Sequence, residues 1–352
     1  MIINTKKTFL FFVKILGGFC IARYFTRKGI RILCYHGVSS DDHWKFNGIL
    51  FMRSPTFLQR MKFLKKNKYN VLSLERALSL SEKELLPPCP VVITADDGWR
   101  YTYTDTAKVA NEFDFPLTVY VTSYYADAEV CVLNVVVRYL IWKSFDRVVD
   151  LSNFFSGDCG CVCLDSSNKK EVLDKVLEFV EKQPTLVDRK LTVERFAECL
   201  GFDGNSIIND QVFNLMSKDE IRQAAASGIN IQLHTHRHRY PSDDLSSLRN
   251  EIEKNREILE PLVGKKLVHL CYPSGVFSTQ AFDTLKKLNI QSAVTCEPGF
   301  VTAKTNRLAL PRFLDGENIS AIEFEAEMSG VLEIFRGLRS MLKRAFGPGD
   351  NH

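Results

Sequence analysis

The chain has 352 residues, of which 45% are hydrophobic and 25% charged, so it can form an ordinary globular core without disulfides. The formal net charge is only +4, and the charges are mixed along most of the chain. Nucleic-acid-binding domains usually concentrate basic residues in one stripe, so this composition argues against a nucleic-acid partner.

The N-terminal segment is apolar and basic. Residues 8–22 are largely hydrophobic, but Lys14 and the pair Gly17-Gly18 interrupt them. A membrane-spanning helix needs about 20 apolar residues, and a signal peptide needs a small-residue cleavage site that is poorly formed here. We therefore expect residues 1–28 to form either an interfacial helix or a helix that packs on the core.

Buried strands alternate with helices along the body of the chain. Apolar runs predict strands over residues 30–35, 91–95, 117–122, 229–233, 267–272 and 291–295. Helices are predicted between them, opened for example by Ser54-Pro55 and by a capping box formed by Ser217 and Glu220. The alternation predicts an α/β fold with a parallel sheet or barrel over residues 29–320. Residues 125–212 interrupt the pattern and are expected to be a helical insertion.

The C-terminal segment, residues 321–352, contains an amphipathic pattern over residues 331–346. Its apolar face includes Phe335, Leu338 and Leu342, while Lys343 and Arg344 lie on the basic face. Such a helix suits a membrane surface or a partner, and it equally suits packing on its own domain.

Three polar motifs follow three of the predicted strands. They are TADDG at 94–98, HTHRH at 234–238 and YPSG at 272–275. Catalytic groups gather at the C-terminal ends of parallel strands, so this placement favours one common site. Asp-Gly and Pro-Ser-Gly also occur in ordinary turns, and each motif alone is weak.

The histidine motif carries the strongest signal. His234 and His238 are four residues apart, so a helical turn would place them on one side, whereas an extended strand would separate them by about 13 Å. Two imidazoles and a nearby carboxylate form a typical ligand set for one metal ion. His236 should point away. Of the adjacent residues Asp96 and Asp97, one could then bind the metal while the other stays free as a base.

Together with Tyr35-His36-x-Val38, these motifs resemble the polysaccharide deacetylases, carbohydrate esterase family 4, which carry the NodB-homology domain. The similarity runs from about residue 30 to 315 outside the insertion. It implies a distorted (β/α) barrel and one divalent metal ion, usually zinc. By position, it implies the metal ligands Asp97, His234 and His238, with Asp96 as general base. Ser274 occupies the position whose backbone N–H assists catalysis.

The chain departs from the family pattern at two points. Cys271 stands where many members carry an arginine that pairs with the base, and no late Leu-x-His motif supplies a general acid. We predict that His36 provides the missing acid, because His43 falls in a loop and His269 inside a strand. Leu310-Pro311-Arg312-Phe313 resembles the closing strand of a subgroup that also lacks the usual arginine.

The resemblance predicts a metal-dependent hydrolase that removes N-acetyl groups from an amino sugar in a polysaccharide or a lipid-linked glycan precursor. Two alternatives stay open, an inactive carbohydrate-binding relative and a different amide or ester hydrolase on the same scaffold. The ten cysteines include no CxxC pair, and several lie in apolar runs, as in a reducing compartment. We therefore expect a cytoplasmic protein with peripheral contact to the inner face of the membrane through both termini.

Overall fold

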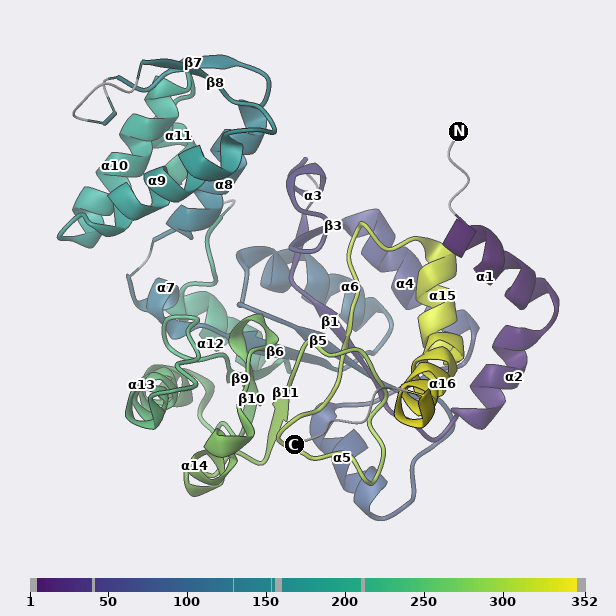
Figure 1. The fold of residues 1–352 in the computed structure, drawn as a ribbon. Coiled ribbons are helices and arrows are strands. Elements are labelled where there is room, and N and C mark those ends of the chain that lie inside the picture. The colour runs from purple at the N-terminus through teal and green to yellow at the C-terminus, as the bar shows by residue number, and fades with distance from the viewer. Residues whose placement is uncertain are drawn as a thin grey trace.

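A curved parallel sheet forms the centre of the molecule in a computed structural model (Figure 1), which describes residues 5–39, 42–128, 130–152, 154–155, 160–209 and 213–346. Within that last range, the side chains of residues 340 and 342–346 are outside the description. The sheet has eight strands, and β4 (Asn70–Val71) pairs with the start of one inner strand. The other seven follow the order β11 (Ser292–Val294), β10 (His269–Cys271), β9 (Asn230–Leu233), β6 (Leu117–Val121), β5 (Pro90–Ala95), β1 (Arg31–Tyr35) and β12 (Phe313–Leu314).

The segment before β12 links the two ends of the sheet. Phe313 pairs with Leu33 of β1, and Leu310, three residues earlier, forms a parallel bridge with Val294 of β11. The sheet therefore curls into a half-barrel whose open side this segment crosses. The predicted α/β fold of the distorted (β/α) barrel type is confirmed.

Helices surround the sheet because each buries one apolar stripe against it. They are α4 (Ser54–Lys66), α5 (Leu74–Glu82), α6 (Ala107–Glu112) after a π-helical turn at Thr102–Thr106, α12 (Lys218–Ala226), α13 (Leu245–Val263) and α14 (Phe282–Lys287). The capping box predicted at Ser217 and Glu220 is present and opens α12. Ser54 and Pro55 are the first two residues of α4, and Arg53, not Ser54, is its N-cap.

The segment between β6 and β9 builds a second hydrophobic core. It contains α7 (Ser123–Ala128), α8 (Leu133–Lys143), the hairpin of β7 (Val148–Asp150) and β8 (Cys161–Cys163), α9 (Lys169–Glu181), α10 (Leu186–Cys199) and α11 (Gly204–Asn209). Val137, Phe154 and Phe196 are fully buried among these elements. Figure 1 shows most of them standing to one side of the sheet. Cys159 lies outside the described residues, and Cys161 and Cys163 are exposed.

The first two and the last two helices of the described chain lie together, on the side of the sheet away from this second core (Figure 1). Residues 8–22 fall on two helices, α1 (Thr5–Ile15) and α2 (Gly18–Phe25), which meet at a bend of 79°. Gly17 makes the bend with a left-handed backbone, φ 79°. These helices pack against α15 (Ala321–Ser329) and α16 (Val331–Phe346), which come about 300 residues later in the chain.

Among the described residues, no single helix is long and apolar enough to cross a membrane. Counted together, the bent pair α1 and α2 meets the same test of length and composition. The apolar and basic faces predicted for residues 331–346 include Leu342, Lys343 and Arg344, whose side chains lie outside the described residues.

Candidate metal and catalytic site

The three polar motifs turn sharply where their strands end. In each motif at least one non-glycine residue has a left-handed backbone, with φ of 68° at Asp97, 62° at Thr235, 55° at His238 and 56° at Ser274. Such residues are uncommon, each costs about 1–3 kcal/mol, and they concentrate at functional sites. On a straight strand the adjacent side chains of Asp96 and Asp97 would point to opposite faces, and the turn at Asp97 allows both to reach the same site.

Asp97, His234 and His238 converge from β5 and from the loop after β9. Asp97 Oδ1 lies 3.2 Å from His234 Nε2 and 3.4 Å from His238 Nε2. One potential ligand atom from each residue lies within 4.8 Å of those of the other two. The two imidazole rings are 4.8 Å apart between centroids. Three donor atoms so close together can hold a single divalent ion and leave other coordination positions open.

The hydrogen bond on the far side of His234 shows that this donor set fits a cation. His234 Nδ1 lies 2.9 Å from the carbonyl oxygen of Cys271 and must donate a proton to it. In the neutral imidazole Nε2 is then an acceptor, and it faces the acceptor Asp97 Oδ1. Two acceptors at that distance repel unless a proton or a metal ion lies between them, which is the arrangement typical of metal-binding histidines.

The pKa values of Asp97, His234 and His238 are shifted by burial and by the charges of their close neighbours. Burial raises the pKa of Asp97, but contact with the histidines outweighs burial and leaves that pKa well below its usual range. Burial lowers the pKa of His234, and the carboxylates of Asp97 and Asp96 outweigh it, so the net shift is upward. At His238 burial prevails and lowers the pKa.

Neighbouring groups hold both ligand-bearing strands in place. Trp99 Nε1 donates to Asp97 Oδ2 at 2.9 Å, so that only Oδ1 faces the histidines. Asn255, fully buried on α13, accepts a bond from the His234 backbone at 3.0 Å and donates to the carbonyl of Val121 at 3.1 Å. His236 lies apart from the cluster, with Nδ1 bonded to Ser123 Oγ at 3.0 Å.

Asp96 lies beside this cluster in a different environment. It is 3% exposed, and Arg312 donates to both of its oxygens at 2.7 Å. The thiols of Cys34 and Cys271 donate to Oδ2 at 3.4 and 3.3 Å. Burial raises the pKa of Asp96, but the Arg312 charge outweighs burial and lowers it, so Asp96 is ionised at neutral pH.

Arg312 is the functional residue that the sequence interpretation missed. The family position for this arginine holds Cys271, and the guanidinium comes instead from the segment that joins β11 to β1. Arg312 is itself 0% exposed, and its Nη2 lies 3.2 Å from Cys271 Sγ. The small cysteine side chain leaves the room that Arg312 occupies. The available signal was the arginine in Leu310-Pro311-Arg312-Phe313, the segment that resembles the closing strand of a subgroup without the usual arginine.

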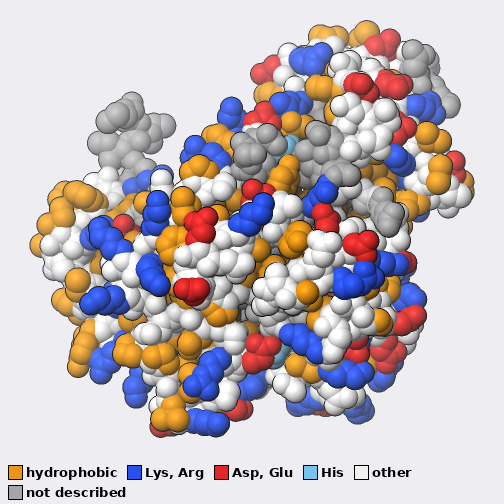
Figure 2. Space-filling model, turned by 180° about the vertical axis from the view of Figure 1, so that it is seen from behind, with side chains coloured by type: hydrophobic (Ala, Val, Ile, Leu, Met, Phe, Trp, Pro, Cys, Tyr) orange, Lys and Arg blue, Asp and Glu red, His pale blue; other side chains and the backbone are white. Residues whose placement is uncertain are grey.

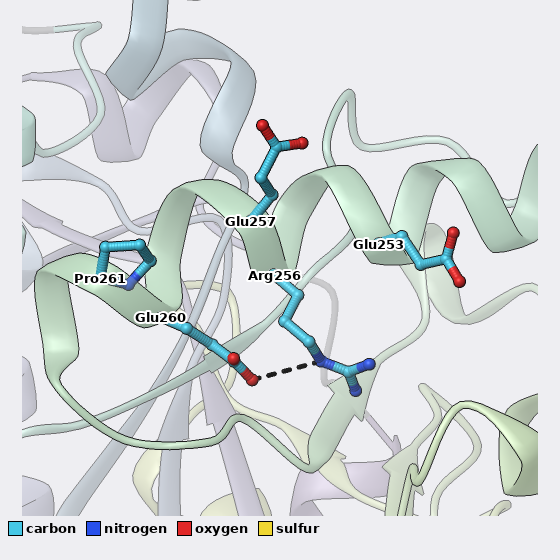
Figure 3. Close-up of a pocket in the computed structure, with 5 residues that line it drawn as sticks. All are labelled: Glu253, Arg256, Glu257, Glu260 and Pro261. Carbon is cyan, nitrogen blue, oxygen red and sulfur yellow. Dashed lines mark ion pairs between the residues drawn. The ribbon is translucent and has the colours of Figure 1, made fainter.

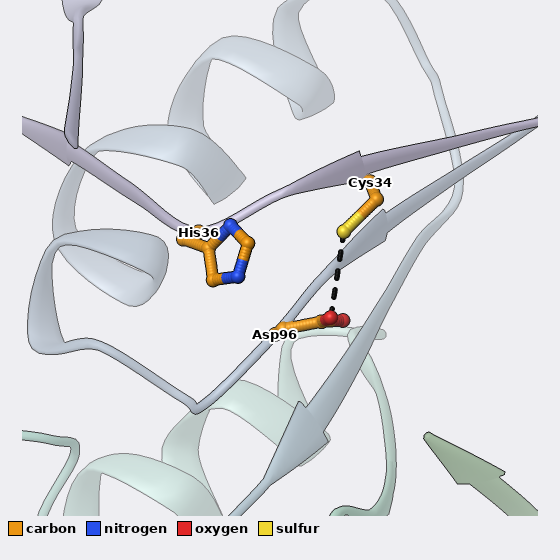
Figure 4. Close-up of side chains that lie close together, drawn as sticks. All are labelled: Cys34, His36 and Asp96. Carbon is orange, nitrogen blue, oxygen red and sulfur yellow. Dashed lines mark hydrogen bonds between the residues drawn. The ribbon is translucent and has the colours of Figure 1, made fainter. Parts of the chain in front are cut away.

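His36 lies at the same rim as Asp96 (Figure 4). Cys34, His36 and Asp96 each place one potential ligand atom within 4.8 Å of the other two. His36 Nδ1 is buried and has no hydrogen-bond partner. Ser274 is exposed on the turn after β10, next to the strand that leads into His234.

Two further pockets lie away from these residues. One has a volume of about 310 Å³ on α13 (Figure 3), where Arg256 pairs with Glu260 at 3.4 Å and Glu253, Glu257 and Pro261 complete the wall. The other, of about 480 Å³, lies between the chain ends and the loop containing Phe300. Neither is lined by a residue of the Asp and His cluster.

The polysaccharide deacetylase family model matches residues 179–293, which carry His234, His238 and the YPSG turn. The resemblance to the polysaccharide deacetylases is confirmed. The match begins inside the segment expected to be an insertion. It places the chain with hydrolases that act on carbon–nitrogen bonds other than peptide bonds. No curated protein matches the chain.

Solved structures of deacetylases share the fold. The Streptococcus pyogenes deacetylase PplD in complex with acetate is 17% identical, with a TM-score of 0.56 over 86% of this chain and 99% of its own. A Bacillus cereus polysaccharide deacetylase is 18% identical, with a TM-score of 0.53 over 86% of this chain and 69% of its own. A de-N-acetylase from Aggregatibacter actinomycetemcomitans is 14% identical, with a TM-score of 0.54 over 85% and 99%. At these identities the likeness shows the fold alone.

Proposed function

We propose that the protein is a metal-dependent deacetylase that removes N-acetyl groups from an amino sugar of a polysaccharide or a glycan precursor. The observation that carries the proposal is the convergence of Asp97, His234 and His238 within 4.8 Å, beside an ionised and arginine-bound Asp96. The acetate bound to the S. pyogenes relative is the product that such a reaction would release.

In this proposal Asp97, His234 and His238 hold one divalent ion, for which zinc is the natural candidate given two imidazoles and one carboxylate. Such an ion would act as a Lewis acid on the acetamide carbonyl and would lower the pKa of water bound to it. The Cys271 carbonyl holds the proton of neutral His234 on Nδ1, which leaves the lone pair of Nε2 for the ion, and Trp99 leaves one oxygen of Asp97 for it.

Asp96 is proposed to accept a proton from the attacking water. Arg312 keeps the carboxylate charged and fixes its plane through two hydrogen bonds. The thiols of Cys34 and Cys271 both donate to Oδ2, so Oδ1 is the oxygen left to accept the proton. The pKa-lowering effect of Arg312 makes Asp96 a weak base, and its value lies in position more than in basicity. The backbone N–H of Ser274 is proposed to donate to the oxyanion.

Acetate release from N-acetylated glycans, with and without a chelator, tests this function. We expect release by the metal-loaded protein, at least about a 10³-fold loss after chelation, and recovery when zinc is added back, because metal-assisted charge stabilisation is worth several kcal/mol. Unchanged release in chelator would contradict metal dependence. A chain that binds glycans but releases no acetate would be the inactive relative, and release from simple esters alone would indicate another hydrolase.

His36 is proposed to protonate the leaving amine. Its position beside Asp96 and its buried, unpartnered Nδ1 support this role. We expect His36→Gln to lower acetate release about 10²-fold near neutral pH while metal content stays at the wild-type level, because glutamine cannot transfer the proton. Release equal to wild type would remove His36 from the mechanism. Loss of metal with activity would instead give it a structural role.

The substrate and the location of the protein are also proposals. The family implies an N-acetylated polysaccharide, and we propose a lipid-linked precursor on the cytoplasmic side of the membrane. The nine described cysteines are all free, which supports a reducing compartment.

A further inference from the structure

Hydrophobic side chains gather on the surface formed by the two chain ends. Of the nineteen exposed large hydrophobic side chains among the described residues, eleven lie between residues 9 and 25 or between 335 and 341. Figure 2 shows hydrophobic side chains gathered along one edge of the molecule, the side on which α1 and α2 lie. We call these eleven the terminal apolar face: Phe9, Phe11, Phe12, Ile15, Leu16, Ile21, Tyr24, Phe25, Phe335, Leu338 and Met341.

The helices that form this face are fixed in place by their opposite sides. Leu10, Phe19 and Ala22 are buried against Ala326 and Val331 in a small separate core. Lys6 pairs with Glu323 at 2.8 Å, and Lys14 pairs with Glu325. The rings of Phe9 and Phe335 lie 5.8 Å apart and join α1 to α16.

Helix α1 exposes large apolar side chains on its outer side. Two of its three lysines, Lys6 and Lys14, form ion pairs with α15, whereas Phe12 on α1 and Leu16 directly after it are 58% and 81% exposed. A helix of a free-standing soluble domain turns its apolar stripe inward. A contiguous apolar face of this kind is costly in water and marks a surface that something covers.

Charge and composition identify what covers the terminal apolar face. The first 40 residues contain seven Lys and Arg and no Asp or Glu. Lys7, Lys28 and Arg339, within a few residues of members of the face in sequence, are exposed. Six of its eleven side chains are aromatic, five Phe and one Tyr, and Phe and Leu are typical of the apolar face of helices that lie in a membrane interface. Basic charge around an aromatic and aliphatic face is typical of helices that lie in the interface of an anionic membrane.

We propose that the terminal apolar face docks the protein onto an anionic lipid bilayer, with α1, α2 and α16 lying in the headgroup region and the rest of the chain on one side. Spanning by α1 and α2 would pull Leu10, Phe19 and Ala22 out of their core and break two ion pairs with α15, so the structure favours docking over insertion. This inference does not depend on the proposed deacetylase function.

Vesicle flotation of the full chain tests the proposal. We expect binding to vesicles of equal parts phosphatidylcholine and phosphatidylglycerol, weaker binding to phosphatidylcholine alone, and release by high salt or carbonate. The double variant Phe12→Asn with Leu16→Asn should bind at least about tenfold more weakly, because it removes two large apolar side chains from the contact. Acetate release by this variant from a soluble glycan should match wild type.

A matched control uses exposed apolar residues elsewhere. Val187 and Leu191 on α10 are 66% and 50% exposed, and Val187→Asn with Leu191→Asn should bind vesicles as wild type does. If the first pair impairs folding, Phe25→Asn, at a residue 74% exposed, replaces it. The proposal would be overturned if the terminal and control variants bound vesicles equally well. It would also be overturned if the wild-type protein bound neutral and anionic vesicles equally well, or if carbonate did not release it. So would a dimer that the terminal substitutions dissociate in the absence of vesicle binding.

Discussion

Replacing Asp97, His234 or His238 with alanine is expected to remove the metal and the deacetylase activity together. The three donor atoms lie within 4.8 Å of one another, so each variant leaves only two protein ligands for the ion. Loss of a Lewis acid worth several kcal/mol lowers the rate by about 10³-fold or more. Elemental analysis of each purified variant, paired with acetate release, measures both effects.

His236→Ala provides the matched control. His236 lies between the two proposed ligands in sequence, but its ring is bonded to Ser123 Oγ and lies apart from the cluster. This variant should keep its metal and most of its activity. Full metal occupancy in the His234 or His238 variants would contradict the ligand set, and so would loss of metal in His236→Ala.

Asp96→Asn is expected to keep the metal and to lose acetate release by about 10²–10⁴-fold, the usual contribution of a general base. An amide cannot accept the proton from water, although its oxygen can still accept a hydrogen bond from Arg312. Since Asp96 is not among the three ligands, metal content should be unchanged. An active Asp96→Asn protein would remove Asp96 from the mechanism.

Asp315→Asn separates this chemical effect from the cost of disturbing a buried ion pair. Asp315 is buried and pairs with Arg60 at 2.9 Å, as Asp96 pairs with Arg312, but it contacts the ring hydroxyl of Tyr35 outside the Asp and His cluster. Burial raises the pKa of Asp315 to about 6, which still leaves it mostly ionised near neutral pH, so the amide removes the charge that faces buried Arg60 just as Asp96→Asn removes the charge that faces Arg312. Loss of stability in both variants, with loss of activity in Asp96→Asn alone, is the expected result.

The alternating strands and helices could be predicted from the sequence because apolar runs, caps and turn residues act over a few neighbours. The box that opens α12 and the span of α16 are local patterns of this kind. The pairing of His234 with His238 is also local, since spacing alone requires the chain to turn between them. The turn itself uses Thr235 in a left-handed conformation, which residue type does not predict.

Only the tertiary structure decided which distant groups meet. Arg312 reaches Asp96, 216 residues earlier in the chain, because its segment joins β11 to β1 across the sheet. Likewise, the sequence by itself determined that residues 8–22 are apolar and basic, but an apolar pattern on nearly every side of a helix does not say which side is buried. The core shared with α15 and α16 decided that, and it left the aromatic side of α1 facing outward. Local physical chemistry sets the elements and the residue types at strand ends, whereas long-range packing sets their partners.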